Sequence, residues 1–381
     1  MTKLTKRQVL LDKIEAEVGV AETVDAAVNA VLALSGTEIT PEGEKVADDR
    51  LSDTLSKQPH AIGRLVNGLT RQHELRGGGI TGSVVAEPDY SALLQSCALT
   101  RSAVVFVAAE AGTGTFAAGE TVTGFTSGAV GSLIAVVGGG LLLEAVSGTY
   151  QDEETLTGST SEATATATAG PVTGHQYTPL SNPDLTKTIT TVYYRDGHKF
   201  TVTGCRSDLS LSLPVGQPGK LNFTQQGRFT LPVEAANPTP TLSTHKPPLC
   251  VNLGLAIGSY ALSGVNELTL ALGNTLTKDE DLNAPDGLHT YIITDRTPTG
   301  SVDPKADALT TFDPWTAWKD GTLARLAFLL GSEPGNRIFI EAPSIQYVTP
   351  AYGDREGTMT TALSFELKGV SGDDELRLVY F

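Results

Sequence analysis

The sequence is short of cysteine pairs, of aromatic residues and of positive charge. Its three cysteines, Cys97, Cys205 and Cys250, are far apart and odd in number, so neither a disulfide framework nor a CxxC metal or redox motif is predicted. We expect them to be reduced and buried, in a protein that folds in a cytoplasm. Aromatic residues make up only 6% of the chain, which argues against carbohydrate binding around its carboxylates.

Basic residues are outnumbered by acidic ones. The chain has 27 Lys and Arg against 43 Asp and Glu, a net charge of −16. Binding to nucleic acid relies on Lys and Arg contacts with phosphates, so this balance argues against a nucleic-acid-binding protein. An acidic protein could still surround nucleic acid without adhering to it.

Long hydrophobic runs are also lacking. The most apolar stretch, Val130 to Val146, is interrupted by Gly138–Gly140 and is too short to cross a bilayer. The first nineteen residues are charged throughout and lack the apolar centre of a signal peptide. We therefore expect no membrane segment.

The sequence contains no recognisable motif for catalysis or for ligand binding. Its six histidines are scattered, with no HExxH motif, and Gly138–Gly140 is not followed by the Lys-Ser/Thr of a phosphate loop. Acidic runs such as Asp279–Asp281 lack the ligand spacing and fixed glycine of a calcium loop. We predict no enzyme activity, no cofactor and no metal site. Trp315 and Trp318, three residues apart, are expected to be core residues of a short helix.

What the sequence does contain is glycine, proline and alternating hydrophobicity. Its 40 glycines and 20 prolines suit many short strands and turns. The stretch Lys199 to Phe229 alternates apolar and polar residues in three runs, Phe200–Val202, Leu209–Leu213 and Leu221–Phe223, and a GQPG turn at Gly216–Gly219 separates the last two. Arg337 to Gly369 repeats this layout, with RIFIEAP, then SIQYV, then the turn YGDREG and then TALSFELKG. Both stretches predict half-buried antiparallel strands.

The order strand, acidic loop, strand, helix, three strands occurs twice, at about 29–230 and 251–381. In the first half the first four elements are expected at 29–34, 37–60, 62–75 and 89–99. In the second half they are expected at 266–272, 278–287, 289–295 and 313–319. We infer that the chain contains one β module twice.

A segment of different composition interrupts the first module. Residues 104–173, here called the insert, contain acidic residues but no Lys, Arg or His. GTFAAGETVTGFTSGA from Gly114 aligns with GTYQDEETLTGSTSEA from Gly148. Between the copies, 132–137 and 141–146 flank a GGG turn and are predicted to form a hairpin. The insert is therefore expected to be a small β domain with an internal repeat.

These observations predict a mainly β fold with two tandem β-sandwich or barrel modules, each with a short flanking helix, and one inserted β domain. The expected division is 1–103 for the first half of module 1, 104–173 for the insert, 174–236 for the rest of module 1, 237–250 for a Pro-rich linker and 251–381 for module 2.

Several motifs, taken in order, resemble the major tail tube proteins of tailed bacteriophages. They are SLSLPVGQPGKLNFTQQGRF (210–229), DRTPTGSVDPKA (295–306), DPWTAWKDG (313–321), GNRIFIEAP (335–343), YGDREG (352–357) and SGDDELRLVYF (371–381). The opening MTKLTKRQVLLDKIE is similar too. The resemblance covers most of the chain except the insert, whose role it leaves open.

This resemblance implies a structural, non-enzymatic virion protein whose rings stack into a hollow tube for the genome. In that family a long loop between two early strands reaches the next ring, and here the candidates are Thr37–His60 and Lys278–Gly287. Their charged residues are the expected stacking residues: Glu42, Glu44, Asp48, Asp49, Arg50, Asp53, Lys278, Asp279, Glu280 and Asp281.

The resemblance also implies partners and a location. The expected partners are further copies of the chain, the tape measure, terminator and distal tail proteins, and phage DNA that passes an acidic lumen without specific binding. Because the module is duplicated, a homotrimeric ring with pseudo-sixfold symmetry is favoured over a hexamer. The protein is expected in the virion tail, assembled in the host cytoplasm, with the insert on the outer surface. The alternatives are a decorating or adhesive β protein of the virion surface and, less favoured, a carboxylate-based hydrolase.

Overall fold

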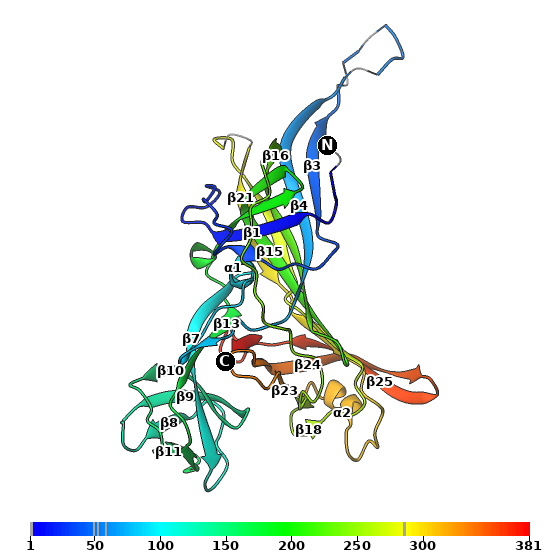
Figure 1. Ribbon diagram of the computed structural model, residues 1–381. Coiled ribbons are helices and arrows are strands. Elements are labelled where there is room, and N and C mark those ends of the chain that lie inside the picture. The colour runs from blue at the N-terminus through cyan, green and yellow to red at the C-terminus, as the bar shows by residue number, and fades with distance from the viewer. Residues whose placement is uncertain (1–2, 49, 52, 58, 285–286) are drawn as a thin grey trace.

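A computed structural model describes residues 3–381 except 49, 52, 58, 285 and 286. The chain is mainly β, as the sequence predicts, and the described part has two short α-helices, α1 (Ser91–Ser96) and α2 (Pro314–Lys319). Figure 1 shows an elongated molecule with a long β hairpin projecting at one end and the insert at the other. Between them runs a continuous antiparallel sheet.

This central sheet contains two groups of strands that follow one another across it. The first unit is β3 (Glu38–Val46), β4 (Ala61–Glu74), β16 (Lys220–Glu234) and β15 (His198–Pro214). The second unit is β19 (Glu267–Ala271), β22 (Thr299–Val302), β25 (Thr358–Leu367) and β24 (Ile338–Arg355). Each strand pairs with the next in the order given, and β15 pairs with β19 to join the units.

Smaller strands complete the fold around the central sheet. They are β1 (Gln8–Ile14), β2 (Ala30–Val31), β5 (Ile80–Thr81), β6 (Val84–Val85), β14 (Ile189–Arg195), β17 (Ala256–Ile257), β18 (Tyr260–Ala261), β20 (Asn274–Glu280), β21 (Leu288–Arg296), β23 (Ala324–Leu330) and β26 (Arg377–Tyr380), with a 3₁₀ turn at Pro183–Leu185. β20 and β21 form a separate hairpin.

The core lies on one face of the central sheet because side chains alternate between faces along each strand. In β15, Leu209, Leu211 and Leu213 are buried, whereas Ser210 and Ser212 are on the other, half-exposed face. The main apolar cluster continues through both units and includes residues from α1. The three cysteines are buried and unpaired, as expected.

The predicted loop 37–60 is wrong in its first part. Residues 38–46 form β3, which pairs with β4 to make the long hairpin. Pro41, Gly43 and the charged residues of this stretch disfavour a strand by propensity, but pairing with β4 outweighs propensity. Pro41 is tolerated because the described structure pairs β3 on one side only. Similarly, 278–280 belong to β20, and the strand expected at 29–34 is reduced to β2.

Runs predicted as separate strands are joined. Phe200–Val202 and Leu209–Leu213 both belong to β15, which continues through the polar residues 204–208 with a register shift near Gly204. Gly204 has a φ of +60°, which favours glycine. Two polar residues of this stretch have partners: the buried Ser207 hydroxyl accepts a hydrogen bond from Ser96 Oγ at 2.8 Å, and half-buried Asp208 accepts one from the Asn274 backbone amide. RIFIEAP and SIQYV are likewise joined, in β24.

Each of the two helices contacts the last strand of one unit of the central sheet. α1 contacts β15 of the first unit and α2 contacts β24 of the second. Asp313 caps α2 by accepting hydrogen bonds from the backbone amides of Trp315 and Thr316. The expectation that both tryptophans are core residues is wrong: Trp318 is 42% exposed, and Trp315 is half-buried and donates to the Tyr352 hydroxyl. A helix of six residues on an open strand cannot bury both rings.

The insert is built on strands that extend from the first module. These strands are β7 (Leu99–Ala111), β8 (Thr121–Gly124), β9 (Val130–Val137), β10 (Gly140–Ser147), β11 (Thr155–Gly158), β12 (Thr164–Ala167) and β13 (Val172–Pro179). The predicted hairpin is confirmed as β9 and β10, which pair around Gly138 and Gly139. A separate small cluster that includes Val107, Leu133 and Leu156 forms its interior.

Candidate assembly surfaces

Two hairpins from different halves of the chain lie side by side and are joined by ion pairs. Arg64 of β4 contacts Glu44 of β3, with Nε to Oε1 at 2.9 Å, and Glu280 of β20, with Nη1 to Oε1 at 2.7 Å. Lys278 Nζ lies 3.2 Å from Glu44 Oε1. The hydrogen bonds from Arg64 and then Lys278 lower the pKa of Glu44. The hairpins β3–β4 and β20–β21, here called the arms, therefore act as one projection (Figure 1).

This network brings together three of the residues predicted from sequence, Glu44, Lys278 and Glu280. Arg64 was missed, although an arginine near the start of the return strand, beside an acidic loop, is a signal that could have found it. Asp279 pairs separately with His289, with Oδ2 and Nδ1 3.1 Å apart.

The other predicted stacking residues stay apart from the network. Asp48 pairs locally with Arg50, with Oδ2 to Nη2 at 2.5 Å. Glu42 and Asp53 are exposed. Asp281 Oδ1 accepts a hydrogen bond from the Asn283 backbone amide, which shapes the second loop. Asp49 lies outside the described residues.

The ends of both arms also carry leucines that are fully open to solvent. Leu51 and Leu55 lie at the end of the first arm and Leu282 at the end of the second, with relative exposures of 103%, 106% and 102%. These leucines are candidate contact residues, because burying them against another chain would remove apolar surface from water. The sequence prediction missed these leucines because it considered the charged residues of the loops. Isolated leucines in otherwise polar loops would have identified them.

The face of the central sheet opposite the core is polar, and we call it the polar face. Two lateral rows of cross-strand neighbours cross both units. One row is Glu74, Lys220, Ser212, Thr269, Ser301, Ser364 and Thr349; the other is Gln72, Asn222, Ser210, Ala271, Thr299, Glu366 and Gln346. All of them are half-buried or exposed. The surface is hollowed over the middle of these rows.

Side-chain hydrogen bonds join neighbouring strands of this face, one across the junction of the units and one within the second unit. Ser212 Oγ donates to Glu267 Oε1 at 2.6 Å, and the hydroxyl oxygens of Thr269 and Ser301 lie 2.7 Å apart. Lys220 is the one basic residue in the two rows and lies opposite Glu74. The two rows therefore form an uncharged-to-acidic surface in which Lys220 is an isolated positive charge.

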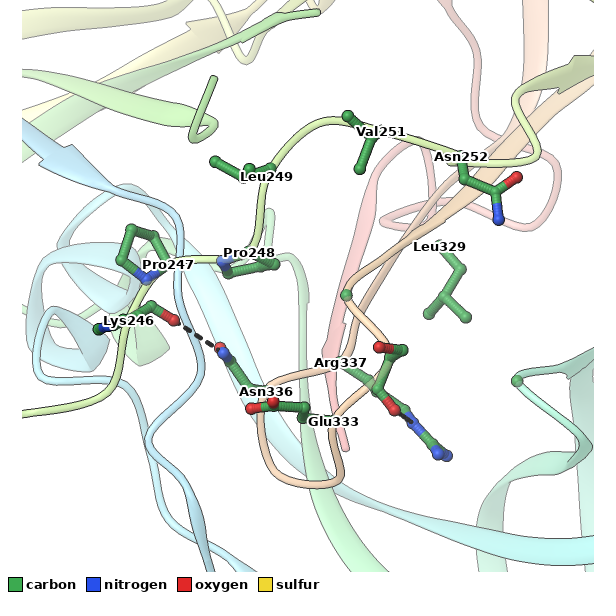
Figure 2. A pocket seen from close by; sticks show the side chains of 13 residues that line it. Lys246, Pro247, Pro248, Leu249, Val251, Asn252, Leu329, Glu333, Asn336 and Arg337 are labelled. Atoms are coloured by element: carbon green, nitrogen blue, oxygen red, sulfur yellow. Dashed lines mark hydrogen bonds between the residues drawn. The ribbon is translucent and has the colours of Figure 1, made fainter. Parts of the chain in front are cut away.

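A pocket lies between the Pro-rich segment, the loop 331–337 and the insert (Figure 2). Asn336 Nδ2 donates to the Lys246 carbonyl at 2.9 Å. The Arg337 guanidinium lies over the rings of Phe106 and Phe381, 5.3 and 5.9 Å from their centroids. Among the described lining residues Glu333 is the one carboxylate, so this pocket does not supply the pair that carboxylate hydrolysis needs. Its contacts join the insert to the second half of the chain.

Among the described residues, the side chains form no metal-binding group and no helix is a membrane span. No group of three or more His, Cys, Asp or Glu residues is placed to hold a metal ion. None of the described helices has the length and apolarity to span a membrane.

Comparison with known proteins gives one family. The family model described as phage tail tube protein matches residues 5–369. The match includes the insert within its span. No curated protein matches the chain.

Proposed function

This chain belongs to the phage tail tube protein family and is a structural protein of the virion tail, and we propose that its copies close into rings that stack into a hollow tube for the DNA. We propose further that three chains make one ring, because each chain carries two equivalent units. The observation that carries this proposal is the order of the strands. The units β3–β4–β16–β15 and β19–β22–β25–β24 follow one another in one sheet.

The polar face is proposed to line the lumen. Its rows of Ser, Thr, Asn and Gln, with Glu74 and Glu366, present few groups that could bind phosphate. A surface without basic clusters lets DNA slide past, since no deep electrostatic well holds the backbone. The DNA therefore passes without specific binding.

Stacking is assigned to the arms. They project from the sheet at one end, and their exposed leucines and exposed acidic residues such as Glu42 are placed to contact the next ring. Candidate contacts from the predicted set are Glu42, Glu44, Asp48, Asp49, Arg50, Asp53, Lys278, Asp279, Glu280 and Asp281. Other tail proteins are proposed to contact the ends of the tube, and assembly is proposed to occur in the host cytoplasm.

The insert is proposed to lie on the outer surface of the tube. Neither row of the polar face contains a residue from 104–173, so the lumen wall forms without it. Its own apolar cluster lets it add to the module without replacing core residues.

Electron microscopy of the purified protein at high concentration tests this function. Rings with threefold symmetry, stacked into hollow tubes, are expected. Sixfold rings would keep the tube but contradict the use of both units in one ring. A protein that stays monomeric under all conditions would contradict the proposal and favour a decorating or adhesive role.

A further inference from the structure

We infer that the insert is a brace: it fixes the orientation of the two units of the central sheet within a chain, and closed rings require it. The first part of this inference concerns the single chain, and the second part rests on the proposed ring. This role extends beyond the outer position proposed above. Loss of the brace should prevent closure even though no residue of the insert lies in the two rows of the polar face.

Three strands of the insert are apolar on both faces. Successive side chains of a strand point to opposite faces, and a strand at the surface of a domain normally has one polar face. In contrast, β7, β9 and β10 each contain two adjacent buried apolar residues: Phe106 and Val107, Leu133 and Ile134, and Leu142 and Leu143. Both faces of these strands are therefore covered by protein.

The two faces belong to different apolar clusters. One residue of each pair points into the insert and forms its interior. The outward residues, Phe106, Ile134 and Leu142, pack against the second half of the chain. The cluster that they join includes Phe339 of β24 and Val379 of β26. Burial of this outer apolar face holds the insert against the second half, because separation would expose it to water.

Arginines of the second half add polar contacts around this cluster. Arg325 Nη2 donates to a backbone carbonyl of β9 at 3.3 Å. Arg377 Nη2 donates to Glu144 Oε1, also at 3.3 Å, and the Arg337 guanidinium lies 5.3 Å from the centroid of the Phe106 ring. The insert has no Lys, Arg or His of its own, so its charge is complementary to that of the three arginines.

The insert thereby strengthens a second connection between the two halves. The first connection is the pairing of β15 with β19 inside the central sheet. The second runs from β7 to β13, from β13 to β26 and from β26 to β24. The twist between adjacent strands ranges from about 10° to about 35°, so one strand pair sets the orientation of the units loosely. A second, separate connection narrows that range.

Ring closure makes this orientation important. In a ring of three chains with two units each, every junction must turn by a matching angle before the last unit meets the first. The junction inside each chain is the one that the brace holds. If its angle varies from chain to chain, assembly should give open arcs instead of closed rings.

Ile134→Asp tests the brace. This substitution places a carboxylate in the cluster shared with the second half and leaves the interior residue Leu133 in place. Val136→Asp is the matched control, because it introduces the same charge two residues along β9, at a position that is 59% exposed. Circular dichroism should show that both variants are folded.

Spin labels measure the orientation within the single chain. Leu231→Cys in the first unit and Met359→Cys in the second are labelling positions that are 70% and 55% exposed, and the native cysteines are buried. The distribution of distances between the labels should be narrow in the parent chain and in Val136→Asp and broad in Ile134→Asp. Electron microscopy of the unlabelled proteins should show closed rings for the first two and open arcs for Ile134→Asp.

Arg337→Ala reaches the same interface without a buried charge, and it decides the question if Ile134→Asp does not fold. It removes the guanidinium from the Phe106 ring and leaves the insert unchanged. Lys246→Ala is its control, because Lys246 is an exposed residue of the same pocket. Arg337→Ala should broaden the distance distribution, and Lys246→Ala should leave it narrow.

The outcomes separate this inference from the proposed function. Narrow distributions in both interface variants would overturn the brace and leave the tube standing. Broad distributions together with normal closed rings would overturn its part in closure. Absence of rings in the parent chain would overturn the proposed function, whereas broad distributions in the interface variants would still support the brace within a chain.

Discussion

At the scale of single residues, the first module depends on a buried ion pair. Arg71 and Asp12 are both inaccessible to solvent, with Nη1 and Oδ2 2.8 Å apart. Thr191 Oγ1 donates to the same carboxylate, and Gln225 Nε2 donates to Thr191. Asp12 is the charged partner of the Arg71 guanidinium in this group, so loss of either residue leaves an unpaired charge in the core.

Asp12→Ala should lower the free energy of unfolding by about 3–5 kcal/mol, because Arg71 is left buried and uncompensated. Urea unfolding followed by circular dichroism measures this loss. Lys13→Ala is the control: its ion pair with Glu22 is partly exposed and should contribute much less, because solvent screens it. Equal effects of the two substitutions would contradict the role of the buried pair.

His73 should make the fold sensitive to acid. Burial, together with the charge of Arg71, lowers the pKa of His73 from 6.5 to about 3. The unfolded chain therefore takes up a proton that the folded chain excludes. Stability should be unaffected above about pH 6.5 and should fall by about 1.4 kcal/mol per pH unit below it, until about pH 3.

Urea unfolding between pH 7 and pH 4 checks this slope. His73→Gln should lose stability at all pH values and should lack this part of the pH dependence. An unchanged slope in the variant would show that other groups cause the acid sensitivity.

At the scale of elements, the two repeats of the insert are joined by reciprocal hydrogen bonds. Glu120 of the first repeat accepts hydrogen bonds from the backbone amides of Thr160 and Ser161 in the second. Glu154 of the second accepts from those of Thr126 and Ser127 in the first. This exchange explains why Glu-Thr and Thr-Ser recur at matching places in the two copies.

Glu120→Gln should destabilise the insert by about 1–3 kcal/mol, since a carboxylate oxygen that accepts backbone donors is replaced by an amide. Burial alone would raise the pKa of Glu120, but the hydrogen bonds from Ser161, Ala117 and Thr160 lower it to about 2. The carboxylate therefore stays charged at neutral pH. Hydrogen exchange measured by mass spectrometry should show faster exchange in 114–163. Glu153→Gln, at an exposed neighbouring position, should change nothing.

The ends of the arms are expected to control the length of the tube. Replacing Leu51, Leu55 and Leu282 together by serine removes the apolar contact proposed between rings. The strands of the central sheet are left unchanged. Electron microscopy should show rings with few or short tubes. Val136→Ser in the insert is the control and should leave tubes long. Tubes of normal length in the triple variant would contradict apolar contact at the arms.

At the scale of the whole molecule, charge opposes assembly. Each chain carries a net charge of −16, so neighbouring chains repel one another in the proposed ring. The Debye length is about 10 Å at 0.1 M salt and about 3 Å at 1 M. Assembly should therefore increase with sodium chloride, which sedimentation velocity can measure. Tubes that dissociate as salt rises would show instead that ion pairs between chains hold them together.

Much of the fold was predictable because it depends on local pattern. The alternation in Leu209–Leu213 and Leu221–Phe223 identified strands and their buried faces, and Gly138–Gly140 identified a hairpin. Asp313 and Pro314 predicted the start of α2. The strand at 38–46 was missed because Pro41 and Gly43 oppose it locally, and only pairing with β4 overrides them.

The candidate site was predictable in part. Their charges identified Glu44, Lys278 and Glu280 as candidates in two loops. Their ion pairs, with Arg64 or between Lys278 and Glu44, form because two hairpins that are far apart in the chain lie side by side. By itself the sequence determined the β class and predicted a duplicated order of elements, because side-chain period and turn residues act within a few positions. The tertiary structure alone decided which strands pair, which face of the sheet stays polar and which edges remain open. Strand partners are chosen by hydrogen bonding and burial between distant segments, and no local pattern records that choice.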